Sequence, residues 1–327
     1  MARLDIICSL EKYVVDFVIT LLDEKKKKIL SKGKIIDITR LFYIIQIILI
    51  NIKNNIYTTL RQIFYTNPKL FINQRNSNKI IGKLTRIIKK SREQINIYNA
   101  PKGIIRGNIL LKENKSSKWV DCMNAFELRG HLICPFGLEN INISSGVQYI
   151  LIIEKETIFY KLLQSNYIST YGPTILITAK GFPDINTRQL LYEIQKRYRE
   201  LKIFCLTDYD VYGLSIACTY ASKNESKLYY VYDMSIENLH WLILFTPEEG
   251  IKKNVIKNTD LTKLTLKDIR ILDNLCAKLK NNNKYSAAER NNWIENISNM
   301  KKFGVKYEID AINDIEKHIN NRIKELL

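Results

Sequence analysis

The spacing of apolar positions changes near residue 149. Before it, apolar residues recur at helical spacing in three segments, 3–23, 35–63 and 76–92. After it, short apolar runs alternate with helical stretches, which is typical of an α/β fold with a doubly wound, mainly parallel sheet. The pattern therefore predicts a helical first part followed by a sheet flanked by helices.

One predicted helix of the first part has a basic face. In segment 76–92, isoleucine and leucine occupy one side, and lysine and arginine occupy much of the other. Segment 95–111 contains Gly103 and Gly107 and predicts two short strands joined by a turn. Helices followed by a strand–turn–strand unit are the pattern of a winged helix, which usually lays one helix in the major groove of DNA. Segment 112–146 is polar and irregular, and we expect it to bridge two domains.

The second part predicts four strands, at 147–154, 174–178, 202–207 and 227–232. Helices are expected between these strands, and the last segment, 261–327, is expected to be mostly helical.

The charges follow the same division. The formal net charge is +18. Residues 1–145 hold 25 lysines and arginines against 11 acids, whereas residues 146–327 hold 26 against 22. A basic first part beside a nearly neutral second part favours a polyanion as the partner of the first.

Several classes of site and location are disfavoured. Six cysteines without CxxC spacing and three dispersed histidines predict neither zinc nor a disulfide framework. The longest apolar run, 41–52, is shorter than the ~20 residues of a membrane span, and charges interrupt the first residues, so we expect neither a membrane segment nor a signal peptide. Lys25–Lys28 is either a nuclear address or a solvated turn. Without a Walker-type phosphate loop, the chain is not expected to hydrolyse ATP.

Acidic residues follow two of the predicted strands. Glu154 ends one strand, and Asp208 and Asp210 follow another. Strand ends carry the ligands in open α/β sheets, and carboxylates without histidine or cysteine favour Mg²⁺ over zinc. The same acids could instead cap helices or lie in loops. The pattern makes Glu154, Asp208 and Asp210 candidate Mg²⁺ ligands.

Tyr65 is the candidate nucleophile of the basic part. A tyrosine can attack a phosphodiester, but its pKa near 10 means that it needs help. Arg61 lies one helical turn earlier and shares its face if the helix persists. Its guanidinium could stabilise the phenolate and bind the phosphate. The alternative is a tyrosine ring packed at a helix end, with Arg61 in solvent.

Blocks of sequence, in order, resemble the family that contains the A subunit of topoisomerase VI together with its eukaryotic relative, the meiotic double-strand-break transesterase. These blocks are 61–74, 100–107, 150–156, 178–188, 208–213, 240–242 and 304–309.

The resemblance implies an α/β chain in which a winged-helix domain with the nucleophile precedes a Toprim domain with the metal. We expect a helical extension at 1–40, the winged helix at 41–145, and the Toprim domain with C-terminal helices at 146–327. Of the family's two adjacent tyrosines the second attacks, and here the first position is Phe64. Arg61 matches the assisting arginine, and Glu154, Asp208 and Asp210 match the Toprim acids.

The resemblance further implies an Mg²⁺-dependent DNA transesterase that acts on double-stranded DNA as a homodimer. Each tyrosine, opposite the partner's metal site, would form a 5′-phosphotyrosyl link, and the resulting double-strand breaks would initiate meiotic recombination in the nucleus. The implied partners are a topoisomerase VI B-like protein with an ATPase fold and accessory recombination proteins. The residues expected to contact DNA are Arg75, Lys79, Lys83, Arg86, Lys102, Arg106, Lys180, Phe182 and Arg188.

Three other functions stay open. The chain could be the cutting subunit of a strand-passing topoisomerase, a non-catalytic DNA-binding scaffold, or a Toprim nuclease that acts through water. One departure from the family pattern is that Val211 and Tyr212 replace the usual proline and histidine after the second aspartate. The acids are retained, so the departure concerns DNA positioning more than metal binding.

Overall fold

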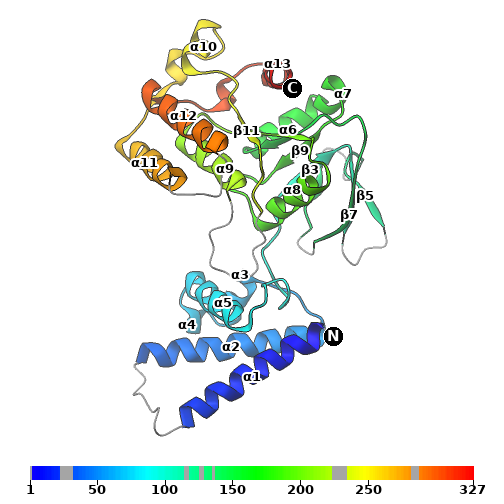
Figure 1. Cartoon of the computed structure of the whole chain (residues 1–327), viewed down its shortest axis with the longest axis vertical. Coiled ribbons are helices and arrows are strands. Elements are labelled where there is room, and N and C mark those ends of the chain that lie inside the picture. Colours follow the sequence, from blue (N-terminus) through cyan, green and yellow to red (C-terminus); the bar gives the residue numbers. More distant parts are fainter. Residues whose placement is uncertain are drawn as a thin grey trace. The chain divides into compact units, whose positions relative to one another are not determined.

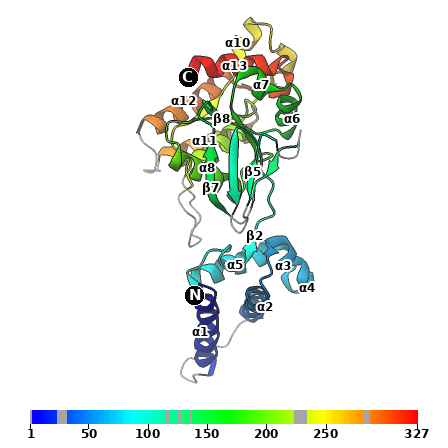
Figure 2. The same ribbon diagram turned by 90° about the vertical axis from the view of Figure 1, so that its right-hand side faces the viewer.

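A computed structural model describes residues 2–22, 32–113, 118–124, 129–134, 137–222, 234–280 and 287–327 (Figures 1 and 2). These residues belong to two units. Unit 1 contains the described chain up to Ala100, and unit 2 contains the described chain from Pro101 onward. The expected strand at 227–232 and the lysines 25–28 lie outside the described residues.

Unit 1 is built from helices whose apolar faces meet in one core. Helices α1 (Ala2–Leu22), α2 (Lys32–Asn54) and α5 (Gln74–Ile88) pack against one another, and the short helices α3 (Leu60–Thr66) and α4 (Pro68–Phe71) contact α5. The fully or nearly fully buried core residues are Ile6, Leu10, Leu41, Ile44, Ile45, Ile48, Ile52, Ile63, Phe71, Ile80, Ile81, Leu84, Ile88, Ile95 and Ile97.

The helices predicted for 3–23 and 76–92 are confirmed as α1 and α5. The break expected near residues 51–55 is also present, because α2 ends at Asn54 and α3 begins at Leu60. Between them, β1 (Thr58–Thr59) pairs in parallel with β2 (Ile97–Tyr98). Because β2 is close to the last residue of unit 1 in sequence, this pairing ties the start of α3 to the C-terminal end of the unit.

Helix α2 is strongly apolar and packs against α1, α4 and α5. Its segment Gly33–Asn54 is long and apolar enough to cross a membrane, the one such helix among the described residues. Its side chains Leu41, Ile44, Ile48 and Ile52 are nevertheless core residues that are at most 3% exposed. Burial within unit 1 thus accounts for the hydropathy of this face of the helix.

Unit 2 is organised around a six-stranded sheet in the order β11-β10-β8-β9-β3-β6. The first four of these strands are parallel to one another, and β3 and β6 run antiparallel to their neighbours. The strands are β3 (Ile104–Gly107), β6 (His131–Leu132), β8 (Tyr149–Ile153), β9 (Ile175–Thr178), β10 (Lys202–Leu206) and β11 (Leu239–Leu242).

Helices cover both faces of this sheet, as Figure 1 shows. The chain passes through them between the parallel strands and again after the last of these strands. They are α6 (Glu156–Gln164), α7 (Tyr167–Tyr171), α8 (Ile185–Arg197), α9 (Val211–Ala221), α10 (Pro247–Lys252), α11 (Leu266–Lys280), α12 (Ala287–Phe303) and α13 (Ile315–Leu326).

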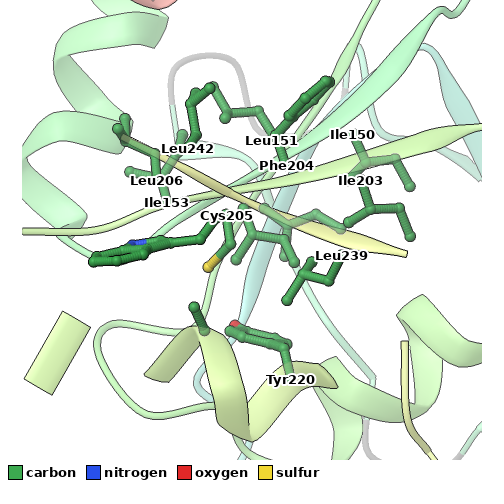
Figure 3. Close-up of a cluster of buried hydrophobic side chains, with 14 of the residues drawn as sticks. Ile150, Leu151, Ile153, Ile203, Phe204, Cys205, Leu206, Tyr220, Leu239 and Leu242 are labelled. Atoms are coloured by element: carbon green, nitrogen blue, oxygen red, sulfur yellow. The ribbon is translucent and has the colours of Figure 1, made fainter. Parts of the chain in front are cut away.

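The central strands are buried along their whole length. Every residue of β8 is buried, and in β10 all but the first are buried. Figure 3 shows Cys205 of β10 and Leu239 of β11 on the side of the sheet where Tyr220 of α9 lies, whereas the ring of Phe204 lies on the opposite side. Burial on both faces explains why these strands are continuous apolar runs instead of alternating ones.

Two segments of the first part differ from the sequence-based expectation. The strands expected at 95–111 as a wing are divided, because β3 pairs with β9 of the six-stranded sheet and β4 (Ile109–Glu113) joins a separate antiparallel sheet with β5 (Trp119–Asp121) and β7 (Leu138–Ile143). Segment 112–146 therefore contributes strands to unit 2. For this reason the units divide after Ala100, whereas the sequence placed the domain boundary at 145.

The C-terminal helical region contains one small strand pair. β12 (Thr262–Lys263) pairs antiparallel with β13 (Val305–Lys306), and a 3₁₀ turn follows at Ile309–Ala311. Residues 305–311 lie beside the sheet edge that carries Asp208, because Tyr209 and Tyr307 form an antiparallel bridge.

We expect Ile48→Ala to lower the free energy of unfolding by about 2–5 kcal/mol, since it opens a cavity in the core of unit 1. The matched control is Ile50→Ala on the same helix, where the side chain is 47% exposed and Ile48 is 0% exposed. The control should change stability by no more than about 0.5 kcal/mol. Urea unfolding followed by circular dichroism measures both, and equal losses would contradict the core assignment of Ile48.

Candidate active site

The helix that carries Tyr65 is fixed at both ends by short polar side chains. At its start, Thr59 Oγ1 accepts the N–H of Gln62 at 3.1 Å, and Gln62 Oε1 accepts the N–H of Thr59 at 2.7 Å. At its end, Asn67 Oδ1 accepts the N–H of Leu70 at 3.1 Å and opens α4, with Pro68 as the first helical residue. This reciprocal cap and the Asn-Pro break define a helix of seven residues.

Tyr65 is exposed on this helix and lies beside Arg61. Its side chain is 57% exposed, whereas its neighbour Phe64 packs against the core of unit 1. The Arg61 Cζ atom is 5.7 Å from the centroid of the Tyr65 ring. The expected shared face is therefore confirmed, and the phenol and the guanidinium can both reach a phosphate outside the unit.

A row of cations runs along α5 of the same unit. Arg75, Lys79, Lys83 and Arg86 are all exposed, and their spacing of four, four and three residues keeps them on one side of the helix. The opposite side carries buried isoleucines and a leucine of the core. No acid occurs within α5, so this side is a continuous basic surface.

The candidate metal ligands of unit 2 meet at the carboxyl ends of β8 and β10. These strands are parallel neighbours, with Ile153 opposite Leu206, so Glu154 and the Asp208–Asp210 turn leave the sheet at the same edge. Glu154 Oε2 accepts the N–H of Asp208 at 3.1 Å. The structure thus brings these strand ends together as the sequence predicted.

The two aspartates of the turn are each held by a backbone N–H. Asp208 Oδ1 accepts the N–H of Ile309 at 2.9 Å, and Asp210 Oδ1 accepts the N–H of Gly213 at 2.6 Å as the N-cap of α9. The alternative role of helix cap is therefore real for Asp210. The hydrogen bond from Gly213 uses the Oδ1 atom of Asp210.

Gly213 lets α9 start directly against this turn. A Cβ atom at this position would lie 2.3 Å from the carbonyl oxygen of Asp208 and 2.5 Å from Thr207 Oγ1. Thr207 Oγ1 in turn accepts the indole N–H of Trp241 at 2.8 Å. Any side chain at Gly213 would push the acidic turn away from the sheet edge.

The three acids are partly buried and repel one another. Burial raises the pKa of Glu154 to about 7, and the charges of Asp208 and Asp210 add to this effect, against the Asp208 N–H that lowers it. Burial also raises the pKa of Asp208 and of Asp210. Clustered carboxylates of this kind are stabilised in their charged form by a cation.

Glu154, Asp208 and Asp210 supply carboxylate oxygens, which are the ligand type that Mg²⁺ prefers. Within the described ranges, no group of three or more His, Cys, Asp or Glu side chains is arranged so that it could hold a metal ion. Mg²⁺ usually keeps several water ligands and takes only one or two carboxylates directly. Glu154, Asp208 and Asp210 lie at one edge of the sheet, so one or two of them could serve as direct Mg²⁺ ligands while water supplies the others.

Sequence reasoning missed three residues beside these acids. Lys155 Nζ lies 3.1 Å from Asp208 Oδ2 and 3.1 Å from Glu308 Oε2, and it also contacts Asp310 Oδ2. Burial lowers the pKa of Lys155, but its three carboxylate partners outweigh burial and raise it overall. The signal available in the sequence was that Lys155 and Glu308 lie inside blocks of the family resemblance.

A loop of unit 2 gathers several of the residues expected to contact DNA. Lys102 Nζ donates to the carbonyl oxygen of Phe182 at 2.5 Å, and the Phe182 side chain is 48% exposed. Lys180 is exposed and pairs with Glu156 at 2.9 Å. Gly103 lets the chain next to Lys102 lie close to α8, because a Cβ atom there would lie 2.0 Å from Thr187 Oγ1 at the start of that helix.

Two predicted DNA contacts are less exposed than the others. Arg188 is 6% exposed and donates to the carbonyl oxygen of Ser222 at 2.5 Å, so its side chain holds α8 against the end of α9. Arg106 is half-buried on β3 and lines a small cavity of about 50 Å³ with residues of α6 and α7. Burial lowers the pKa of Arg106, and the charge of Asp121 opposes that effect. Arg188 is therefore buried within unit 2, whereas Arg106 keeps part of its surface exposed, and its contact with DNA stays a prediction.

Two family models match this chain, and each matches a different part of it. A family model for the Toprim domain of Spo11 and of the topoisomerase 6 A subunit matches residues 149–323, which include all three acids. The family described as "Type IIB DNA topoisomerase" matches residues 37–97, which include Tyr65, Arg61 and α5.

Relatives match over most of the chain. It is 29% identical to the human meiotic recombination protein SPO11 over 273 residues, which are 83% of this chain and 66% of that protein. It is 29% identical to the mouse protein of the same name over 225 residues, 68% of this chain and 55% of that protein. It is 28% identical to meiotic recombination protein SPO11-1 of Arabidopsis thaliana over 310 residues, 94% of this chain and 80% of that protein. The chain thus spans less than two thirds of the human and mouse relatives.

The Toprim-domain match alone covers more than half of the 327 residues, and the second match covers the segment with the tyrosine. The chain therefore belongs to the family of Spo11 and the topoisomerase 6 A subunit.

Proposed function

We propose that this protein is a DNA transesterase that makes double-strand breaks and thereby initiates meiotic recombination. The observation that carries the proposal is the exposed Tyr65 with the Arg61 guanidinium against its ring, in a segment that matches type IIB DNA topoisomerases. The matched relatives are named for meiotic recombination, which favours that role for this chain.

The proposed step is an exchange of one phosphoester for another. The Tyr65 oxygen attacks the phosphorus, the bond from phosphorus to the 3′ oxygen breaks, and a 5′-phosphotyrosyl ester forms. The phenol gives up its proton, and the leaving 3′ oxygen takes one up. Arg61 would bind the phosphate and offset the charge that develops on it. Since one ester replaces another, no external energy source is needed.

Magnesium is the proposed cofactor, with Glu154, Asp208 and Asp210 as the residues that would hold it. When bound, it would supply positive charge against the reacting phosphate. The chemistry of the donor set and the mutual repulsion of the three acids support this assignment.

The proposed DNA contacts fall into two groups. In unit 1 they are Arg75, Lys79, Lys83 and Arg86 along α5, whose exposure suits backbone phosphates. In unit 2 they are Lys102, Lys180 and the exposed ring of Phe182.

The proposed assembly is a homodimer in which the tyrosine of one protomer acts beside the acids of the other. Its further proposed partners are a topoisomerase VI B-like protein with an ATPase fold and accessory recombination proteins, on chromosomes in the nucleus. The cutting role in a strand-passing topoisomerase is the second candidate, and a co-purifying ATPase with relaxation activity would favour it. A scaffold without activity is less favoured, because Tyr65, Arg61 and the acids are all present.

Replacing Tyr65 should abolish covalent attachment of DNA. We expect DNA covalently bound to the parent chain, expressed in cells with its partner and denatured without proteolysis, and a signal at background for Tyr65→Phe. The matched control is Tyr57→Phe, a nearby tyrosine whose hydroxyl donates to Asn55 Oδ1 at 3.2 Å. Equal signal from parent and Tyr65→Phe would exclude Tyr65 as the nucleophile.

Removing cations from α5 should weaken DNA binding in a salt-dependent way. For Lys79→Gln with Lys83→Gln, the slope of log K against log salt should become shallower by about 1.8, or about 0.9 for each lost phosphate contact. Fluorescence anisotropy of the full chain with duplex DNA between about 50 and 200 mM salt measures this slope. Lys301→Gln, at a lysine paired with Asp273, is the control and should leave it unchanged. An unchanged slope in the double variant would remove α5 from the DNA interface.

A further inference from the structure

Ile72 is an exposed isoleucine in a strained backbone conformation. It lies between α4 and α5, and its side chain is 70% exposed, whereas the preceding Phe71 is 0% exposed. Its φ and ψ angles are 68° and −47°. A positive φ is uncommon outside glycine and is a clear outlier for a β-branched residue, because the side chain crowds its own backbone.

Hydrogen bonds on both sides of Ile72 hold this conformation. Before it, the carbonyl oxygen of Leu70 accepts from Nε of the buried Arg40 at 2.9 Å. After it, Asn76 Nδ2 donates to the carbonyl oxygen of Phe71 at 2.9 Å. Backbone strain persists only where the surroundings impose it, and it clusters at functional sites. Glycine or asparagine would adopt the same conformation with less strain.

The usual structural role of an apolar residue at this position does not apply to Ile72. It directly precedes Asn73, the N-cap of α5, and an apolar residue there often packs on the fourth residue of the helix. In α5 the fourth residue is Ser77, which is buried and donates its hydroxyl to the carbonyl oxygen of Gln74 at 2.9 Å. With a polar serine at that position, Ile72 keeps its apolar side chain in solvent.

The surroundings of Ile72 are complementary to a polyanion. Segment 55–92 contains no acidic residue, and Lys69 and Arg75 are exposed on either side of Ile72 in the chain. The cations proposed to bind phosphates continue along α5 from Arg75. An apolar side chain within such a basic surface suits duplex DNA, in which a charged backbone flanks grooves lined by the bases.

The position of Ile72 on α5 indicates which part of the DNA it meets. In helix-turn-helix domains, to which winged helices belong, the N-terminal residues of the recognition helix contact base edges in the major groove. Ile72 lies at this end of α5. The 5-methyl group of thymine is the apolar group that base edges present in the major groove.

We propose that Ile72 is a specificity-determining residue that contacts the 5-methyl group of thymine in the major groove. The inference rests on the proposed function, because it takes duplex DNA as the ligand of unit 1, and it deepens that function by naming the base that is recognised. The imposed backbone conformation fixes the direction of the side chain. Its β-branched structure leaves few rotamers, so little side-chain freedom is lost on contact.

Duplexes with deoxyuridine in place of thymidine test this proposal, because uracil lacks only the 5-methyl group. In fluorescence anisotropy, the full chain should bind an A·T-rich duplex about fourfold more tightly than its uracil form for each contacted thymine, as expected for one buried methyl group. Ile72→Asn should bind the two duplexes with equal affinity. Urea unfolding should show that this variant is at least as stable as the parent, since asparagine tolerates a positive φ.

Three variants serve as controls for the thymine preference. Ile50→Asn changes an isoleucine on α2 that is 47% exposed, and it should keep the full preference. Ile72→Val keeps an apolar, β-branched side chain and should keep most of the preference. Lys79→Gln should weaken binding to both duplexes by the same factor, because it removes a phosphate contact and no base contact.

Two results would overturn the role of Ile72 alone. Equal affinity of the parent for both duplexes would leave Ile72 as a contact for a protein partner, and full preference in Ile72→Asn would assign thymine recognition to another residue. If Ile72→Asn does not fold, Ile72→Gly replaces it, since glycine adopts a positive φ freely.

The proposed function fails in a different way. A parent chain that binds neither duplex would overturn the DNA-binding role of unit 1 together with the role of Ile72. Failure of the Tyr65 capture experiment alone would remove the transesterase activity and leave the thymine preference unchanged.

Discussion

The parallel pairing of β8 with β10 is the constraint on which the rest of unit 2 depends. It brings Glu154 against the N–H of Asp208 and places partly buried carboxylates at one sheet edge. Such acids repel one another, so the edge requires positive charge. Unit 2 supplies part of that charge through Lys155, and the proposed Mg²⁺ would supply the rest. The C-terminal segment 305–311 also stabilises this edge, because it holds Asp208 and Lys155 together.

Unit 1 meets a different requirement, which is to keep a reactive side chain exposed and oriented. The helix with Tyr65 is short, and Thr59 and Asn67 cap its two ends. Ile63 and Phe64 attach it to the core, so Tyr65 and Arg61 are left outside. A transesterase must admit a DNA backbone to its nucleophile, and this placement permits that approach. The nearby row of cations on α5 serves the same purpose.

Local patterns in the sequence were sufficient for the longer helices of unit 1, for three of the four parallel strands and for the shared edge of the acids, but β11 was not predicted. They failed where pairing over long distances decides the structure. The sequence pattern predicts that Ile104–Gly107 belongs to a wing, yet this strand pairs with β9 of the six-stranded sheet, some seventy residues later in the chain. Arg188 was predicted to contact DNA, yet its guanidinium donates to the carbonyl oxygen of Ser222 at the end of α9. Lys155 was overlooked because its carboxylate partners Glu308 and Asp310 are separated from it by about 150 residues.

The central claim is that the Tyr65 oxygen becomes joined to the 5′ end of a cut DNA strand. Mass spectrometry of the covalent complex after nuclease and trypsin digestion tests it most directly. Trypsin cuts after Arg61 and Lys69 and releases residues 62–69, in which Tyr65 is the single tyrosine. The account predicts a nucleotide attached through its 5′ phosphate to Tyr65 of this peptide. A nucleotide on another peptide, or one attached through its 3′ end, would contradict it.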